Sequence, residues 1–97
     1  MKFNDKDLKI LRELFDDLSE KDINDFYNEK CFVKVADDYK QAYEDFVDFE
    51  KGFGGTDLSY ENFLTEFNKG YGKSDYVQIA RLFELSDGIY YDNYYCM

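Results

Sequence analysis

The chain has 97 residues, of which 22 are acidic and 12 basic, and it contains no histidine. Without histidine, the commonest general base, the Ser–His and Cys–His pairs and most zinc sites are excluded. The formal net charge of -10 also disfavours direct binding to nucleic acid or to an anionic membrane, because both carry charge of the same sign.

Aromatic side chains separate this sequence from acidic chains that stay disordered. Chains of high net charge usually lack the large apolar side chains that a core requires, whereas this one has ten Tyr and ten Phe. Burying one aromatic ring removes roughly 150–250 Å² from water, which at about 25 cal/mol per Å² stabilises the fold by several kcal/mol before entropy is counted. We therefore expect one folded acidic domain over residues 1–97.

The first third of the chain predicts two helices and a strand. Asn4 or Asp5 can cap a first helix, whose apolar side chains recur every three or four residues up to Leu18. Residues 19–22, Ser-Glu-Lys-Asp, form a capping box that begins a second helix. Residues 31–35 alternate β-favouring side chains and predict a short strand.

The middle of the chain predicts two further helices. Helical spacing returns from Asp37 to about Lys51, with Phe46 and Phe49 among the side chains expected to point inward. Residues 52–55, Gly-Phe-Gly-Gly, predict a loop. A helix from about Ser59 to Lys69 follows, and its apolar stripe is again spaced at three and four residues.

Two structures compete for the C-terminal segment. Alternation over residues 76–85, the Asp87-Gly88 pair typical of a type I′ turn and the Tyr-rich stretch 89–96 predict a hairpin. A helix from Asp75 to Glu84 also fits the apolar spacing. We expect the hairpin, and with it an α+β fold of about four helices packed on a small antiparallel β-sheet.

Few motifs indicate chemistry. Cys31 and Cys96 are far apart in sequence and lack metal-ligand spacing, so we expect two reduced thiols. The first ten residues lack the apolar run of a signal peptide, and no stretch approaches transmembrane length, which predicts a soluble, cytoplasmic protein. No EF-hand loop, phosphate-binding loop or catalytic motif is recognisable, and we expect no enzyme activity, no cofactor and no metal.

Acidic side chains concentrate in two segments. Residues 37–50 hold six acids and one Lys. On a helix, side chains four positions apart share a face and stand about 6 Å apart along the axis, a spacing that approximates a row of DNA phosphates, which advance about 3.4 Å per nucleotide. Asp16 and Asp17 lie near the end of the first helix, where the helix dipole disfavours negative charge. The predicted partner-binding residues are Asp16, Asp17, Asp37, Asp38, Glu44, Asp45, Asp48 and Glu50.

Two C-terminal features are weaker candidates. The outward-facing pair among the tyrosines at 90, 91, 94 and 95 could belong to an interface, where Tyr is enriched. Residues 79–91, Ile-Ala-Arg-Leu-Phe-Glu-Leu-Ser-Asp-Gly-Ile-Tyr-Tyr, are similar to the helix-turn-helix of TetR-type repressors. Phe83 and Glu84 replace the small residues of that family's tight helix crossing, and the segment corresponding to the recognition helix is acidic. We interpret the similarity as coincidence, or as a DNA-binding ancestry turned acidic.

Small size, strong acidity and an aromatic core resemble phage-encoded DNA mimics, most closely the anti-CRISPR proteins that block type I surveillance complexes. The resemblance is compositional and spans the whole chain. It implies that the acidic side chains occupy phosphate sites on the basic DNA-recognition surface of such a complex, in the host cell cytoplasm, and block target DNA binding. The alternative is an immunity or antirestriction-type inhibitor of a basic nuclease or another DNA-binding enzyme, which would use the same kinds of residue.

Overall fold

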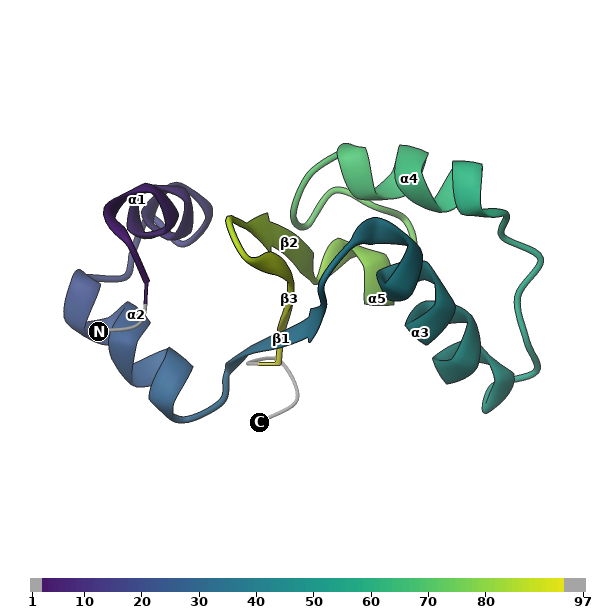
Figure 1. The fold of residues 1–97 in the computed structure, drawn as a ribbon, viewed down its shortest axis with the longest axis horizontal. Helices are drawn as coiled ribbons and strands as arrows, with labels where there is room; N and C mark the ends of the chain where they lie inside the picture. Colours follow the sequence, from purple (N-terminus) through teal and green to yellow (C-terminus); the bar gives the residue numbers. More distant parts are fainter. Residues whose placement is uncertain (1–2, 94–97) are drawn as a thin grey trace.

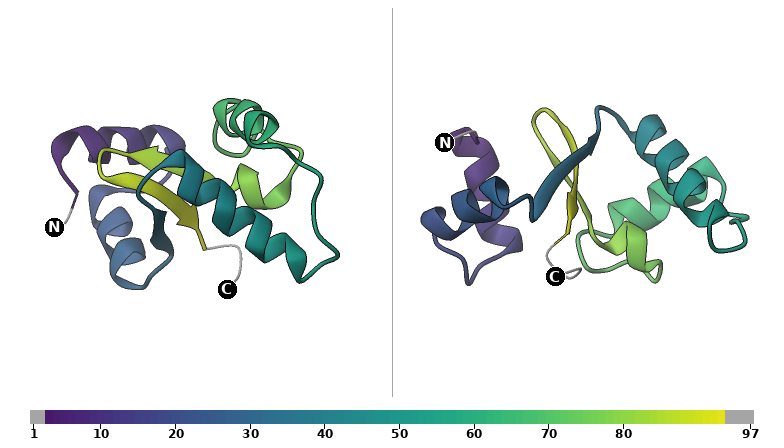
Figure 2. Two further views of the ribbon diagram at one scale, coloured as in Figure 1. Left: turned by 45° about the vertical axis from the view of Figure 1, so that its right-hand side comes forward. Right: turned by 90° about the horizontal axis from the view of Figure 1, so that it is seen from below.

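Helices cover both faces of a three-stranded antiparallel sheet in the computed structural model, which describes residues 3–93 (Figure 1). The strand order is β1-β3-β2, so β3 lies in the centre. The first two helices lie on one face of the sheet and the other three on the opposite face, as the views of Figures 1 and 2 agree. The elements are α1 (Asp5–Leu14), α2 (Glu20–Asn28), β1 (Phe32–Ala36), α3 (Tyr39–Lys51), α4 (Tyr60–Asn68), α5 (Val77–Ala80), β2 (Leu82–Leu85) and β3 (Gly88–Asp92).

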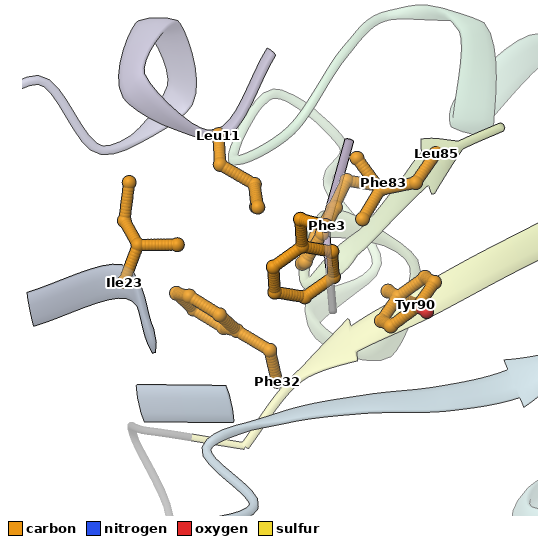
Figure 3. Close-up of a cluster of buried hydrophobic side chains, with 7 residues drawn as sticks. All are labelled: Phe3, Leu11, Ile23, Phe32, Phe83, Leu85 and Tyr90. Atoms are coloured by element: carbon orange, nitrogen blue, oxygen red, sulfur yellow. The ribbon is translucent and has the colours of Figure 1, made fainter. Parts of the chain in front are cut away.

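The sheet separates two hydrophobic cores. The first core lies between the sheet and α1 and α2, and its side chains converge in Figure 3. The second core lies between the sheet and α3, α4 and α5. The first core consists of Phe3, Leu11, Ile23, Phe32, Phe83, Leu85 and Tyr90. The second consists of Ala36, Ala42, Phe46, Phe63, Ile79, Leu82 and Ile89.

Neighbouring residues of the two hairpin strands supply both cores. Successive side chains of a strand point to opposite faces of the sheet. Phe83 therefore packs in the first core while Leu82 packs in the second, and Tyr90 and Ile89 divide in the same way. Because both faces of so small a sheet are covered, the chain needs many large apolar side chains, which accounts for its aromatic content.

The α+β fold with a C-terminal hairpin is as expected from the sequence. The capping box is present: Ser19 Oγ accepts from the Asp22 backbone N–H at 3.2 Å, and Asp22 Oδ2 accepts from the Ser19 N–H at 3.1 Å. For the C-terminal segment each of the two alternatives is partly right. Residues 77–80 form one helical turn, and the strand begins only at Leu82.

Two details of the hairpin differ from the sequence prediction. Leu85 pairs with Gly88, so the turn residues are Ser86 and Asp87, and neither has a positive φ. The prediction of a type I′ turn at Asp87-Gly88 is therefore wrong. The helix-turn-helix similarity of residues 79–91 is not matched by the fold either, because this segment contains β2 and most of β3. The predicted pairing of residues 94–96 falls outside the described residues.

Candidate protein-interaction surface

The solvent side of α3 carries the densest group of predicted site residues. Ala42 and Phe46 direct one side of this helix into the second core. Glu44, Asp45 and Asp48 lie on the other side and are exposed. With a rise of about 1.5 Å per residue, Glu44 and Asp48 stand one helical turn apart. We call these three residues the α3 acidic face.

Local structure does not account for the α3 acidic face. Of its three members, Asp48 has an ion pair, with Lys51 at 3.3 Å between exposed side chains, and such pairs contribute little. Within residues 3–93, Glu44 and Asp45 have no salt-bridge partner. Carboxylates three or four positions apart repel each other on a helix, and Asp48 stands at these spacings from Asp45 and Glu44. These three acids therefore oppose helix formation slightly, and among residues 3–93 only the weak Asp48–Lys51 pair compensates for this.

Asp37 and Asp38, in contrast, have clear local roles at the start of α3. Asp38 is the N-cap, and its Oδ1 accepts from the Gln41 backbone N–H at 2.8 Å. The Asp37 carboxylate pairs with Lys34 Nζ at 2.8 Å, and its backbone N–H donates to Gln41 Oε1 at 2.8 Å. Capping and ion pairing explain both residues without a binding partner, although both remain exposed.

Asp16 and Asp17 belong to a different surface. Both are exposed in the turn after α1, and α1 covers the face of the sheet opposite to α3 (Figure 2). Asp16 lines a shallow groove between α1 and the start of α2, whose lining holds four acidic and two basic side chains. The eight predicted residues thus divide between two sides of the molecule.

Glu50 lies apart from the α3 acidic face, beside a group of exposed apolar side chains. The last turn of α3 extends beyond the sheet (Figure 1). There Glu50 is half-buried in a hollow between the end of α3 and the start of α5. Four apolar side chains line that hollow, and we call them the apolar patch. They are Phe49, Phe53, Tyr76 and Val77, with 47%, 73%, 42% and 68% of their surfaces exposed.

The sequence pattern does not predict the apolar patch. Phe49 was expected to point inward, which is wrong: its ring packs against Phe53 with centroids 5.1 Å apart, and nearly half of it is exposed. Helical spacing places Phe49 at the edge of the buried side, and no described element covers that edge. The Gly-rich composition of residues 52–55 indicates a loop, but a Phe between glycines was the available signal of an exposed apolar side chain.

A groove continues from the apolar patch toward the sheet. It has a volume of about 360 Å³ and shares Phe49 and Gln78 with the hollow of the apolar patch. Its α3 wall includes Asp45 and Phe46, and Tyr91 lines the side nearer the sheet. We call it the α3–α5 groove. Asp45 therefore belongs both to the α3 acidic face and to the wall of this groove.

Reactive groups are scarce in the described part of the chain. Cys31 is buried, and burial raises the pKa of its thiol, which disfavours the nucleophilic thiolate. Residues 3–93 contain no cluster of three or more His, Cys, Asp or Glu side chains placed to hold a metal ion. Cys96 lies outside the described residues. The exposed side chains of residues 3–93 therefore offer charged and apolar surface, which is suited to binding.

Comparisons with known proteins found no match. This holds for protein-family models, for curated proteins and for solved structures. In the described residues, no helix is long and apolar enough to span a bilayer. The two surfaces on the α3 side of the sheet, one acidic and one apolar, are therefore the features from which a function can be argued.

Proposed function

We propose that the protein is a phage-encoded anti-CRISPR protein that acts as a DNA mimic. In this proposal the α3 acidic face binds the basic DNA-recognition surface of a CRISPR surveillance complex in the host cell cytoplasm and blocks target DNA binding. The observation that carries the proposal is the exposure of Glu44, Asp45 and Asp48 on one side of a folded helix, two of them without an ion-pair partner in residues 3–93. The compositional resemblance to anti-CRISPR proteins supports the class of target.

Electrostatics makes the mechanism competitive. A surface that binds DNA gathers Lys and Arg, which neutralise the phosphates. Carboxylates can pair with the same side chains, so the inhibitor and DNA exclude each other. Fixed acids on a rigid helix need no rearrangement to meet such a surface. The net charge of -10 would also steer the two proteins together, which makes association fast and strongly dependent on salt.

Reversing the charge of the α3 acidic face tests the proposal. We expect the triple variant Glu44→Lys, Asp45→Lys, Asp48→Lys to inhibit roughly 100-fold more weakly. Each acid at a solvated rim contributes about 1 kcal/mol or less to the binding free energy. The measurement is displacement of a fluorescent target duplex from a purified type I surveillance complex. Circular dichroism of the variant verifies that α3 still forms.

A matched variant on the opposite side of the sheet serves as the control. Glu13→Lys, Asp16→Lys, Asp17→Lys changes the net charge by the same amount at three exposed positions. We expect its inhibition to stay within about threefold of the parent at physiological salt, since charges beyond the Debye length of about 8 Å are screened. Equal losses in both variants would contradict the assignment to α3, and full inhibition by the α3 variant would overturn the proposal.

Competition with DNA tests mimicry, and inhibition assays on two kinds of target separate the rival classes. If the protein mimics DNA, saturating duplex DNA should release it from its partner, whichever complex that is. A partner retained at full strength under saturating DNA would count against mimicry. Inhibition of a basic restriction nuclease, with no effect on a surveillance complex, would assign the protein to the immunity or antirestriction class instead.

A further inference from the structure

The exposed apolar side chains gather at one end of the molecule. Among residues 3–93, the large apolar side chains with more than 40% of their surface exposed are the four of the apolar patch. They come from three separate segments: the last turn of α3, the loop that follows it, and the start of α5. Soluble proteins seldom expose contiguous apolar side chains without a binding role, and aromatic side chains are enriched at the centres of interfaces.

The apolar patch lies next to the α3–α5 groove, and two acidic side chains lie at its edge. The α3–α5 groove adjoins the apolar patch through Phe49 and Gln78. Asp45 lines the groove, and Glu50 lines the hollow. Arg81 also lines the groove, but its guanidinium lies 4.6 Å from the centre of the Tyr91 ring and its Nε donates to the Asp92 carbonyl at 2.9 Å. The carboxylates at the rim are therefore better placed than Arg81 to receive a charged partner.

We propose that the α3–α5 groove binds a segment of the partner protein in which an aromatic or aliphatic side chain adjoins a Lys or Arg. The apolar side chain enters the groove against Phe46 and Phe49, and the basic group reaches Asp45 or Glu50. The inference deepens the proposed function and rests on it in part, because Asp45 belongs to both surfaces. It adds a contact that DNA does not make, so that charge sets the association rate and the groove lengthens the residence time.

Charge decides between this occupant and two others. A second copy of the chain would bring another net charge of -10 to an acidic rim, and like charges at an interface are unfavourable. Residues 94–97 of the chain itself, Tyr-Tyr-Cys-Met, are apolar but have no basic side chain to meet Asp45 or Glu50. A basic, apolar partner segment satisfies both the groove and its rim.

The test is a selection from a display library of random dodecapeptides on the full chain. Counter-selection uses the double variant Phe49→Ser, Phe53→Ser, whose side chains are exposed enough to be replaced without emptying a core. We expect enriched peptides to carry an aromatic or aliphatic residue within two positions of a Lys or Arg. No enrichment over the double variant, or enriched peptides without basic residues, would overturn the proposal.

Affinity measurements on the best synthetic peptide locate its site. We expect a loss of at least about tenfold on Phe49→Ser, Phe53→Ser and of about three- to tenfold on Asp45→Asn, Glu50→Gln. The matched variant Glu13→Gln, Asp16→Asn, on the opposite side of the sheet, should bind as the parent does. Binding that survives the double Ser variant, a dimer in sedimentation that this variant abolishes, or a tenfold gain in peptide affinity on ending the chain at Asn93 would each refute the proposed occupant.

The outcome is separable from that of the proposed function. If the peptide selection succeeds but charge reversal of the α3 acidic face leaves inhibition intact, DNA mimicry fails and the groove stands. If charge reversal abolishes inhibition while the double Ser variant inhibits like the parent and enriches the same peptides, the groove proposal fails and mimicry stands.

Discussion

Asp7 connects the first helix to the turn of the C-terminal hairpin, 79 positions further along the chain. The residue is buried, with 4% of its surface exposed. Asp7 Oδ1 accepts from the Ser86 backbone N–H at 3.0 Å and from Ser86 Oγ at 2.7 Å. The same residue stands in the first turn of α1, where negative charge complements the helix dipole. One side chain therefore stabilises a helix end and fixes that end to the sheet.

Removing the Asp7 carboxylate should destabilise the protein. We expect Asp7→Ala to lower the free energy of unfolding by about 1–3 kcal/mol, because the Ser86 N–H loses its acceptor in a partly buried place. Urea denaturation measures the change. Asp5→Ala is the matched control, since Asp5 lies in the same first turn but is exposed. Equal losses in both variants would show that only the helix dipole is involved.

Tyr39 makes a second contact between distant segments, from α3 to β2. Its hydroxyl donates to Glu84 Oε1 at 2.5 Å. This hydrogen bond, with burial and the charge of Glu84, raises the pKa of Tyr39 from 10.0 to about 12. Because the phenolate cannot donate, the stabilisation is complete below the unfolded pKa of 10.0 and is lost as the pH rises toward about 12.

The titration of Tyr39 can be measured by difference. We expect the tyrosinate absorbance of the parent minus that of Tyr39→Phe to rise with a midpoint near pH 12. Glu84→Gln should move this midpoint toward the ordinary value, because it removes the carboxylate that stabilises the neutral phenol. A midpoint near pH 10 in the parent would contradict the hydrogen bond.

At the scale of elements, the central strand β3 depends on a close approach at Gly88. This glycine has a φ of 149°, and a Cβ there would lie 2.4 Å from the Ala36 carbonyl oxygen of β1. The pairing of β1 and β3 also shifts register between Lys34 and Ala36. A side chain at position 88 would therefore separate the two strands at the point where they begin to pair.

Gly88→Ala should be far more destabilising than an alanine at another glycine of positive φ. We expect a loss of at least about 3 kcal/mol, from backbone strain plus the clash with β1. Gly55→Ala is the control: Gly55 has a φ of 87°, but nothing lies within 4 Å of its added Cβ, so that only about 1–2 kcal/mol of strain applies. Thermal unfolding compares the two, and similar midpoints would refute the close approach.

At the scale of the whole molecule, acidic charge is poorly compensated. The four ion pairs within residues 3–93 all join side chains three or four positions apart, so they neutralise charge locally and do not connect elements. The molecule measures 39 Å along its longest axis. At low salt the Debye length is about 30 Å, so that nearly all carboxylates repel one another, whereas at 0.15 M it is about 8 Å.

Added salt should therefore stabilise the fold. We expect the melting temperature to rise by several degrees as sodium chloride is raised from low to physiological concentration, since about 1 kcal/mol corresponds to about 4–8 °C in a domain of this size. The neutral variant Glu44→Gln, Asp45→Asn, Asp48→Asn should show a smaller rise. A melting temperature independent of salt in both proteins would contradict this account.

Local patterns in the chain were sufficient for most of the elements. Capping residues such as Asn4 and Ser19 predict where helices begin because their hydrogen bonds join residues three positions apart. The C-terminal segment was harder, because Tyr76 to Glu84 fits helical and strand spacing alike and the structure uses both in succession. There, contacts with the sheet decide between two locally equivalent patterns.

By itself, the sequence determined the α+β class, the capped helices and the concentration of acids on α3, and it favoured the C-terminal hairpin over a helix. Only the tertiary structure decided which of those residues share a surface. It placed Asp16 and Asp17 behind the sheet from Glu44, and it left Phe49 uncovered beside an acidic rim. The physical reason is one of range: hydrogen bonds and side-chain periodicity act within a few residues, whereas burial depends on which layers pack together.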